Sequence, residues 1–165
     1  MNSTVKVCFV CLGNICRSPL AQGVFEALVK EEGLQDRIII SSAGVSGWHL
    51  GNPPDARMQQ TALYHGIHLN SRARQFKSSD FEQMDLVLAM DHSNLSALKQ
   101  MSAEPELQDK LFLFRSFDPK HNNDLEVPDP YYGGGKGFET VYQIVYRTCP
   151  KVLDHLKVQL VKKNE

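Results

Sequence analysis

The sequence predicts an α/β fold: a single domain with a four-stranded, parallel, twisted sheet and helices on both of its faces. Short β-branched runs alternate along the chain with apolar residues at helical spacing. The first two such runs are separated by one helical segment, which is the pattern of a βαβ unit. The 165 residues contain no repeat, linker or low-complexity tract, so we expect one domain over 1–165.

The first βαβ unit is predicted near the N-terminus. "VKVCFV" (5–10) is rich in β-branched and aromatic residues, which favours a buried strand. A helical stripe begins after it, with Ser18 expected as the N-cap, Pro19 at the first helical position and Gly33 at the end. "RIIIS" (37–41) predicts the second strand. We therefore expect a parallel pair joined by a right-handed crossover.

The middle of the chain predicts a second helix and a third strand. In "NPPDARMQQTALYHG" the prolines and Asp55 mark a helix start, and Gly66 marks its end. Ser79 and Glu82 have the S-x-x-E spacing of a capping box, which predicts a helical turn. "DLVLAM" (85–90) then has the apolar composition of a third strand.

The last third of the chain predicts another helix, a fourth strand, a long loop and a final helix. Asp91 or Ser93 is placed to cap the helix that follows the third strand. "LFLF" (111–114) predicts the fourth strand, and a loop rich in proline and glycine extends to Gly137. Apolar residues then keep a helical spacing, in which we expect Pro150 to cause a kink.

The stretch "VCLGNICRSP" (10–19) is poorly suited to a core, because it combines glycine, asparagine and arginine directly after a strand. Ligands of open parallel sheets bind beyond the carboxyl ends of the strands. A glycine-bearing turn that enters a helix directs backbone N–H groups at one point, and arginine adds a fork of donors that matches phosphate oxygens. The sequence therefore predicts a phosphate site made of Leu12, Gly13, Asn14, Ile15, Cys16, Arg17 and Ser18.

Cys11 lies at the start of this predicted phosphate site. A helix N-terminus and the nearby Arg17 favour the thiolate over the thiol, and the thiolate is the nucleophilic form. The Ser18 hydroxyl is then expected near the sulfur as it leaves in a second step. The residues predict covalent catalysis through a phosphocysteine.

The motif C-x5-R-S, here "CLGNICRS", resembles the signature loop of the low-molecular-weight protein tyrosine phosphatases, which also act as acid phosphatases. The similarity continues in the family's order through "SSAGVSGWHLGNPPD", "HGI", "ARQ", "MDHSN" and "DPYYGG". It implies a hydrolase that removes phosphate from phosphotyrosine and small aryl phosphates through a phosphocysteine intermediate. Proteins carrying phosphotyrosine are the implied partners, and phosphate and other oxyanions are the implied inhibitors.

A proton donor must come from elsewhere in the chain, and "VPDPYYGGG" supplies Asp129 between two prolines. By composition alone, an aspartate of an ordinary turn is the better interpretation, because Asp-Pro is common in turns. The resemblance reverses that preference, since the aspartate of the DPYY motif is the proton donor in such phosphatases. The predicted catalytic residues are therefore Cys11, Arg17 and Asp129.

Three aromatic residues are predicted to form a cleft for the substrate: Trp48, Tyr131 and Tyr132. A deep aromatic slot admits phosphotyrosine and leaves shorter phosphorylated side chains out of reach of Cys11. The alternative for Trp48 is a place in the core. Ile15 resembles the tyrosine-specific members of the family, whereas relatives that act on phosphoarginine tend to have threonine there.

The resemblance also suggests supporting residues. Ser42 resembles the family serine that hydrogen-bonds the loop asparagine, here Asn14. Many relatives have a histidine at the position of Ser71, so this network differs here. Asp91 is expected to be a helix cap. Cys16 has two open interpretations, a buried apolar group or a thiol that traps oxidised Cys11 as a reversible disulfide.

The remaining groups give weaker signals. Cys8 and Cys149 fall in apolar patterns and are expected in the core, and the acidic residues Asp118, Asp124 and Glu126 are expected in a solvated loop. The six histidines lack ligand spacing, so we expect no metal and no cofactor.

The composition and net charge limit which partners and which cellular location we expect for the protein. A net charge of −1 gives no reason to expect nucleic acid or a membrane surface as a partner. The start "MNSTVKVCFV" does not fit the pattern of a signal peptide, and the four cysteines show no disulfide pattern, so we expect a cytoplasmic location. We expect a monomer, and weak self-association through Tyr131 and Tyr132 is left open.

Two other functions fit parts of the sequence. A thiol-dependent arsenate reductase shares this fold and loop but needs further cysteines to relay a disulfide, and none occurs between Cys16 and Cys149. A non-catalytic phosphate-binding or phospho-carrier domain has similar topology but no need for both Arg17 and Asp129. The sequence favours the phosphatase over both.

Overall fold

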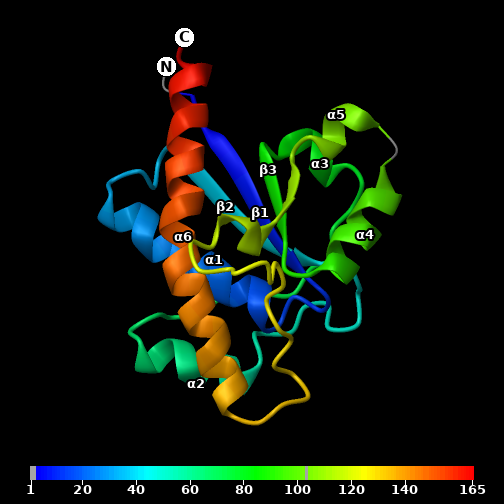
Figure 1. The fold of residues 1–165 in the computed structure, drawn as a ribbon, viewed down its shortest axis with the longest axis vertical. Helices are drawn as coiled ribbons and strands as arrows, with labels where there is room; N and C mark the ends of the chain where they lie inside the picture. The colour runs from blue at the N-terminus through cyan, green and yellow to red at the C-terminus, as the bar shows by residue number, and fades with distance from the viewer. Residues whose placement is uncertain (1–2, 103) are drawn as a thin grey trace.

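The computed structural model describes residues 3–102 and 104–165, and a parallel sheet forms its centre (Figure 1). The strands are β1 (Val5–Cys11), β2 (Ile38–Gly44), β3 (Leu86–Ala89) and β4 (Leu111–Leu113). Their order across the sheet is β2-β1-β3-β4, and every neighbouring pair is parallel. The predicted four-stranded parallel sheet is confirmed.

Helices cover both faces of the sheet, as predicted. They are α1 (Arg17–Glu31), α2 (Ala56–Tyr64), α3 (Asp80–Gln83), α4 (His92–Met101), α5 (Pro105–Gln108) and α6 (Lys136–Lys163), with a 3-10 turn η1 (Phe114–Phe117) after β4. Figure 1 shows α6 and α1 in front of one face and α3, α4 and α5 at the other side. None of the helices in the described ranges is both long and apolar enough to cross a lipid bilayer.

The alternation of strand side chains divides the apolar interior into two clusters. Val7 and Phe9 of β1 belong to the cluster that packs against α1 and α6, whereas Cys8 and Val10 belong to the cluster on the other face. All four side chains are fully buried. Because both faces of β1 are covered, its residues are apolar apart from Lys6 near its start, which is why it was recognisable as a buried strand.

Helix ends match the sequence predictions in part. Asp55 caps α2 by accepting the Arg57 N–H, and Asp91 caps α4 by accepting the Asn94 N–H. Ser79 precedes α3 but its side chain makes no capping bond, so the expected capping box is wrong.

The prediction for the start of α1 was wrong. Its N-cap is Cys16 rather than Ser18, which lies inside the first turn. Ser18 is not free to cap, because its hydroxyl is engaged by two groups of the preceding loop.

Pro150 lies inside α6, which continues past it for a total of 28 residues. α5 was not predicted, since a single polar turn is too short to show a helical period.

The strand order fixes where a ligand binds. The chain leaves β1 toward β2 on one side, and β3 lies on the other side of β1, so a crevice opens beyond the carboxyl ends of β1 and β3. The long loop between η1 and α6 closes onto this crevice, because the Val127 N–H donates to the Met90 carbonyl at 2.8 Å. Both Cys11 and the loop that contains Asp129 therefore reach the same end of the sheet.

The long loop is anchored by the buried charge of Asp118, so the expectation of a solvated acidic residue is wrong at this position; Asp124 and Glu126 are exposed, as expected. The Asp118 side chain is fully buried and accepts hydrogen bonds from Arg115 Nε at 3.0 Å and from Arg147 Nε at 2.8 Å. Asp124 pairs with Arg115 at 3.1 Å, and the Glu126 carboxylate accepts the His92 N–H at 2.9 Å. Asp118 thus joins η1 to α6.

This anchor gives an expected dependence of stability on pH. Burial alone raises the pKa of Asp118, but hydrogen bonds from Arg147, the Lys120 N–H and Arg115 outweigh it and hold the pKa at about 2, below the usual 3.8. A folded-state pKa below the unfolded value stabilises the fold above the unfolded pKa. We expect about 2 kcal/mol of folding free energy from this carboxylate, lost as the pH falls from about 4 to about 2.

Thermal unfolding of the wild type and of Asp118→Asn between pH 6 and 2.5 tests this expectation. The amide has no acid titration, so the variant should be less stable near neutral pH but lose less stability on acidification. An identical pH dependence in the two proteins would show that Asp118 does not supply the acid sensitivity.

Candidate active site

A hollow lies at the carboxyl end of β1. It is lined by Cys11, Leu12, Gly13, Ile15, Cys16, Arg17, Trp48, His49, Asp129, Tyr131 and Tyr132. Three separate segments of the chain therefore meet here: the 11–18 loop, the 48–49 segment and the loop before α6. All the residues predicted to be catalytic and all those predicted to form the cleft line this one hollow.

The 11–18 loop leaves its backbone donors free for an anion. Asn14 has φ 59°, the left-handed conformation that lets the chain turn beneath the site, although its side chain is buried. Within residues 3–102 and 104–165, no carbonyl or side chain accepts the backbone N–H groups of 12–18. The first turn of α1 contributes its unpaired N–H groups to the same set. The loop can bind an oxyanion through these donors and the helix dipole.

Asn14 holds the loop in this shape and orients its hydrogen bonds. Its Oδ1 accepts the Arg74 N–H at 3.0 Å, which fixes the Nδ2 group toward the two serines. Nδ2 donates to Ser18 Oγ at 2.7 Å and to Ser42 Oγ at 3.0 Å. Ser18 Oγ accepts from Asn14, and its own proton can be donated to Cys11 Sγ, 3.0 Å away, or to the Ala43 carbonyl, 3.4 Å away.

The hydrogen bonds that run from Asn14 through Ser42 end on Gln22. This is where the chain has Ser71 in place of the histidine found in many relatives. Ser42 Oγ donates to Gln22 Oε1 at 2.6 Å, so its lone pairs remain for Asn14. Ser71 and Gln22 line the same small surface hollow. Gln22 was not predicted, since a glutamine in an amphipathic helix resembles any exposed polar residue in sequence.

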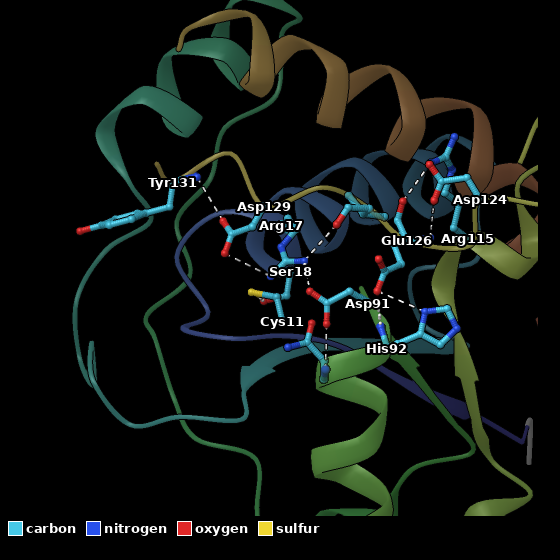
Figure 2. Close-up of polar contacts among 12 residues, drawn as sticks. Cys11, Arg17, Ser18, Asp91, His92, Arg115, Asp124, Glu126, Asp129 and Tyr131 are labelled. Atoms are coloured by element: carbon cyan, nitrogen blue, oxygen red, sulfur yellow. Dashed lines mark hydrogen bonds and ion pairs between the residues drawn. The ribbon is translucent and has the colours of Figure 1, made fainter. Parts of the chain in front are cut away.

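Arg17 is a buried cation held from one side. Its Nη1 donates to Asp91 Oδ2 at 2.7 Å and to the Val127 carbonyl at 3.0 Å, while Nη2 lies 3.5 Å from Asp129 Oδ2 (Figure 2). Burial alone lowers the pKa of Arg17, but the negative charges of Cys11, Asp91 and Asp129 outweigh it and raise the pKa. The guanidinium therefore stays charged, and its Nη2 makes only the longer contact, with Asp129.

Asp91 has two roles, of which sequence analysis identified one. One carboxylate oxygen caps α4 and the other pairs with Arg17. Arg17 is only 2% exposed, so this pairing compensates a charge that has little access to water.

Asp129 lies at the mouth of the hollow. Its Oδ1 accepts the Tyr131 N–H at 3.1 Å, a turn contact that the Asp-Pro sequence alone suggested. Its other oxygen faces Arg17, and the side chain is 33% exposed. The carboxyl is thus close to the buried cation and open to solvent, as a group that exchanges protons with water requires.

Aromatic side chains form the rim of the hollow. Trp48 is 75% exposed, so its interpretation as a core residue is wrong. The Tyr131 ring lies 4.9 Å from the Tyr132 ring and 6.2 Å from the His49 ring. His49 was not predicted, because a single histidine beside a tryptophan carries no motif.

Two glycines allow the close packing around the loop. A Cβ at Gly13 would lie 2.9 Å from the His49 ring, and a Cβ at Gly44 would lie 2.8 Å from the Leu12 carbonyl oxygen. The second approach involves backbone, which cannot move aside without reshaping the loop. Gly44 is therefore part of the support for the anion site.

The four cysteines are buried and form no disulfide. Burial raises the pKa of the Cys8 thiol to about 11, and it also raises the pKa of Cys149. For Cys16, burial and then the charges of Asp55 and Cys11 raise the pKa, so this thiol stays protonated. Both interpretations of Cys16 remain, but a protonated thiol traps an oxidised neighbour slowly. Among the residues that the structure describes, no three side chains of the metal-binding types gather into a cluster.

Both the sequence and the fold of this chain are similar to those of known proteins. A family described as low molecular weight phosphotyrosine protein phosphatase matches residues 6–163. A low molecular weight protein-tyrosine-phosphatase of Streptomyces coelicolor is 43% identical over 158 residues, which are 95% of this chain and 96% of that protein.

Solved structures agree. A protein tyrosine phosphatase from Entamoeba histolytica, crystallised with Hepes in its active site, superposes with a TM-score of 0.90 at 36% identity, covering 94% of this chain and 99% of that one. A Drosophila arginine phosphatase superposes with a TM-score of 0.85 at 37% identity, covering 93% and 98%.

Proposed function

The chain belongs to the low molecular weight phosphotyrosine protein phosphatase family, and we propose that Cys11, Arg17 and Asp129 carry out its hydrolysis of phosphotyrosine. One observation supports this assignment most strongly: the three residues come from separate parts of the chain and line one hollow with the phosphate loop. A phospho-carrier has no need for both Arg17 and Asp129 beside the cysteine, and an arsenate reductase needs further cysteines to relay a disulfide, of which none occurs between Cys16 and Cys149.

In the first step Cys11 Sγ attacks the phosphorus of phosphotyrosine. The loop N–H groups and Arg17 Nη2 bind the equatorial oxygens, while Asp91 and the Val127 carbonyl hold the other guanidinium nitrogen. An S–P bond forms as the bond from phosphorus to the tyrosine oxygen breaks. Asp129 donates its proton to that oxygen, so the product leaves as neutral tyrosine.

In the second step a water molecule attacks the phosphocysteine. The Asp129 carboxylate takes a proton from the water, a P–O bond forms and the S–P bond breaks, which releases phosphate and the Cys11 thiolate. The Ser18 hydroxyl, 3.0 Å from the sulfur, stabilises the charge that returns to it. The enzyme is then ready for another cycle with no change in redox state.

The walls of the hollow support phosphotyrosine as the preferred substrate. Trp48, Tyr131 and Tyr132 offer aromatic surface on which a phenol ring packs, and Cys11 at the bottom is almost fully buried. Ile15 lines the hollow with an apolar side chain, which has no acceptor for the guanidinium of phosphoarginine. Hepes bound in the relative's active site carries a sulfonate, an oxyanion that suits the same kind of loop.

The kcat/KM values on matched peptides with phosphotyrosine, phosphoserine and phosphoarginine test this assignment. We expect phosphotyrosine to exceed phosphoserine by at least about 100-fold, because the shorter side chain cannot bring its phosphorus to Cys11. A phosphoarginine rate above the phosphotyrosine rate would overturn the proposed substrate class.

We further propose that the protein acts in the cytoplasm as a monomer on proteins that carry phosphotyrosine. Four buried free cysteines support a reducing compartment. Inorganic phosphate and related oxyanions are the expected competitive inhibitors, because they fit the loop that holds the substrate phosphate.

A further inference from the structure

Arg115 contacts the segment that leads to Asp129, although it does not line the active-site hollow. Its Nη1 donates to the Glu126 carbonyl at 2.8 Å and pairs with Asp124 at 3.1 Å. Figure 2 shows Arg115 beside Asp124 and Glu126, with Asp91 and Arg17 nearer to Cys11. The mechanism above gives this buried arginine no role.

Arg115 is itself held in a fixed orientation. Its Nε donates to Asp118 Oδ2 at 3.0 Å, and the Asp118 carboxylate also accepts Arg147 Nε and Nη2 at 2.8 and 2.9 Å and the Lys120 N–H at 2.8 Å. Asp118 therefore connects the Arg115 guanidinium to Arg147 of α6. Because this connection fixes the guanidinium, its hydrogen bond can hold the Glu126 carbonyl in one position.

The segment before Asp129 is held at consecutive backbone groups. Arg115 holds the Glu126 carbonyl, Met90 accepts the Val127 N–H, and Arg17 donates to the Val127 carbonyl. The His92 N–H also donates to the Glu126 carboxylate. From residue 127 onward the backbone has little freedom, because Pro128 and Pro130 fix their own φ angles and restrict the residues before them.

From this arrangement we propose that Arg115 is a positioning residue for Asp129, and that it acts by fixing the Glu126 carbonyl three residues before Asp129. The inference rests on the proposed role of Asp129 as proton donor. A rotation at residue 126 moves the Asp129 carboxyl through a short, stiff chain. A displacement of about 1 Å at a proton donor costs up to about 100-fold in rate.

The role predicts a loss that depends on the leaving group. Loss of proton donation slows substrates that release a basic phenolate, such as phosphotyrosine, and spares those that release a strongly acidic phenol, such as 2,4-dinitrophenyl phosphate. The parameter to measure is kcat/KM, because it includes only the steps through release of the phenol. For Arg115→Lys we expect a fall of about 10-fold on phosphotyrosine and a change within about 2-fold on the dinitrophenyl ester.

Arg147→Lys is the matched control, since Arg147 shares the Asp118 carboxylate but does not contact the 126 carbonyl. It should lower the melting temperature by a similar amount and leave the ratio of the two kcat/KM values at the wild-type level. Inhibition by inorganic phosphate should be unchanged in both variants, because neither residue belongs to the phosphate loop. Adding Arg115→Lys to Asp129→Ala should cause no further loss on phosphotyrosine.

The outcomes separate this inference from the assignment of Asp129. Equal losses on both substrates, no loss on either, or the same profile in Arg147→Lys would overturn the role of Arg115 while Asp129→Ala still shows its selective loss. If Asp129→Ala itself shows no dependence on the leaving group, the assignment of the proton donor is wrong and the role of Arg115 is overturned with it.

Discussion

Replacement of Cys11 by serine is expected to reduce kcat on phosphotyrosine by about 10⁵-fold or more. A hydroxyl is a much weaker nucleophile than a thiolate at neutral pH, and the nearest polar side chain, Ser18, lies 3.0 Å away and is no base. The loop N–H groups and Arg17 remain in place, so binding of inorganic phosphate should persist. The measurement is steady-state turnover combined with phosphate binding by calorimetry.

Cys149→Ser provides the control for this substitution. It makes the same chemical change at a fully buried thiol of α6, outside the hollow. We expect a lower melting temperature and nearly wild-type turnover. If Cys11→Ser kept more than a few per cent of wild-type turnover, the covalent intermediate on this sulfur would have to be abandoned.

The sequence was most informative where structure is determined locally. β1, the turn at Asn14 and the start of α1 follow one another without interruption, so strand composition and the spacing from Cys11 to Arg17 were enough to place the phosphate loop. The error at Ser18 has the same local origin. Its position in sequence suits a cap, but a contact with Cys11 inside the folded loop takes its hydroxyl.

Residue patterns did not identify the groups whose roles depend on contacts with distant parts of the chain. Asp129 looked like an ordinary turn aspartate and was assigned only through the family resemblance. Gln22 carries no motif, and its role depends on a contact with Ser42 on another element. The partners of Asp118 include Arg147 on α6, so an acidic residue in a loop rich in proline and glycine was taken to be solvated when it is buried.

Removal of the proton donor should give the second large effect. For Asp129→Ala we expect kcat/KM on phosphotyrosine to fall by about 10² to 10⁴-fold, the usual contribution of general acid catalysis. The loss should shrink steadily along a series of aryl phosphates as the phenol becomes more acidic. Inorganic phosphate should bind as well or better, because a carboxylate 3.5 Å from Arg17 Nη2 no longer repels the anion.

Asp129→Asn distinguishes chemistry from support of the loop. The amide has nearly the same shape and keeps an oxygen that can accept the Tyr131 N–H, but it has no acidic proton to donate. If proton transfer is the role of Asp129, the asparagine variant should show the same loss on phosphotyrosine and the same dependence on the leaving group as the alanine variant. Recovery of activity in Asp129→Asn would mean that the side chain only shapes the loop, and the acid would then have to be sought elsewhere in the hollow.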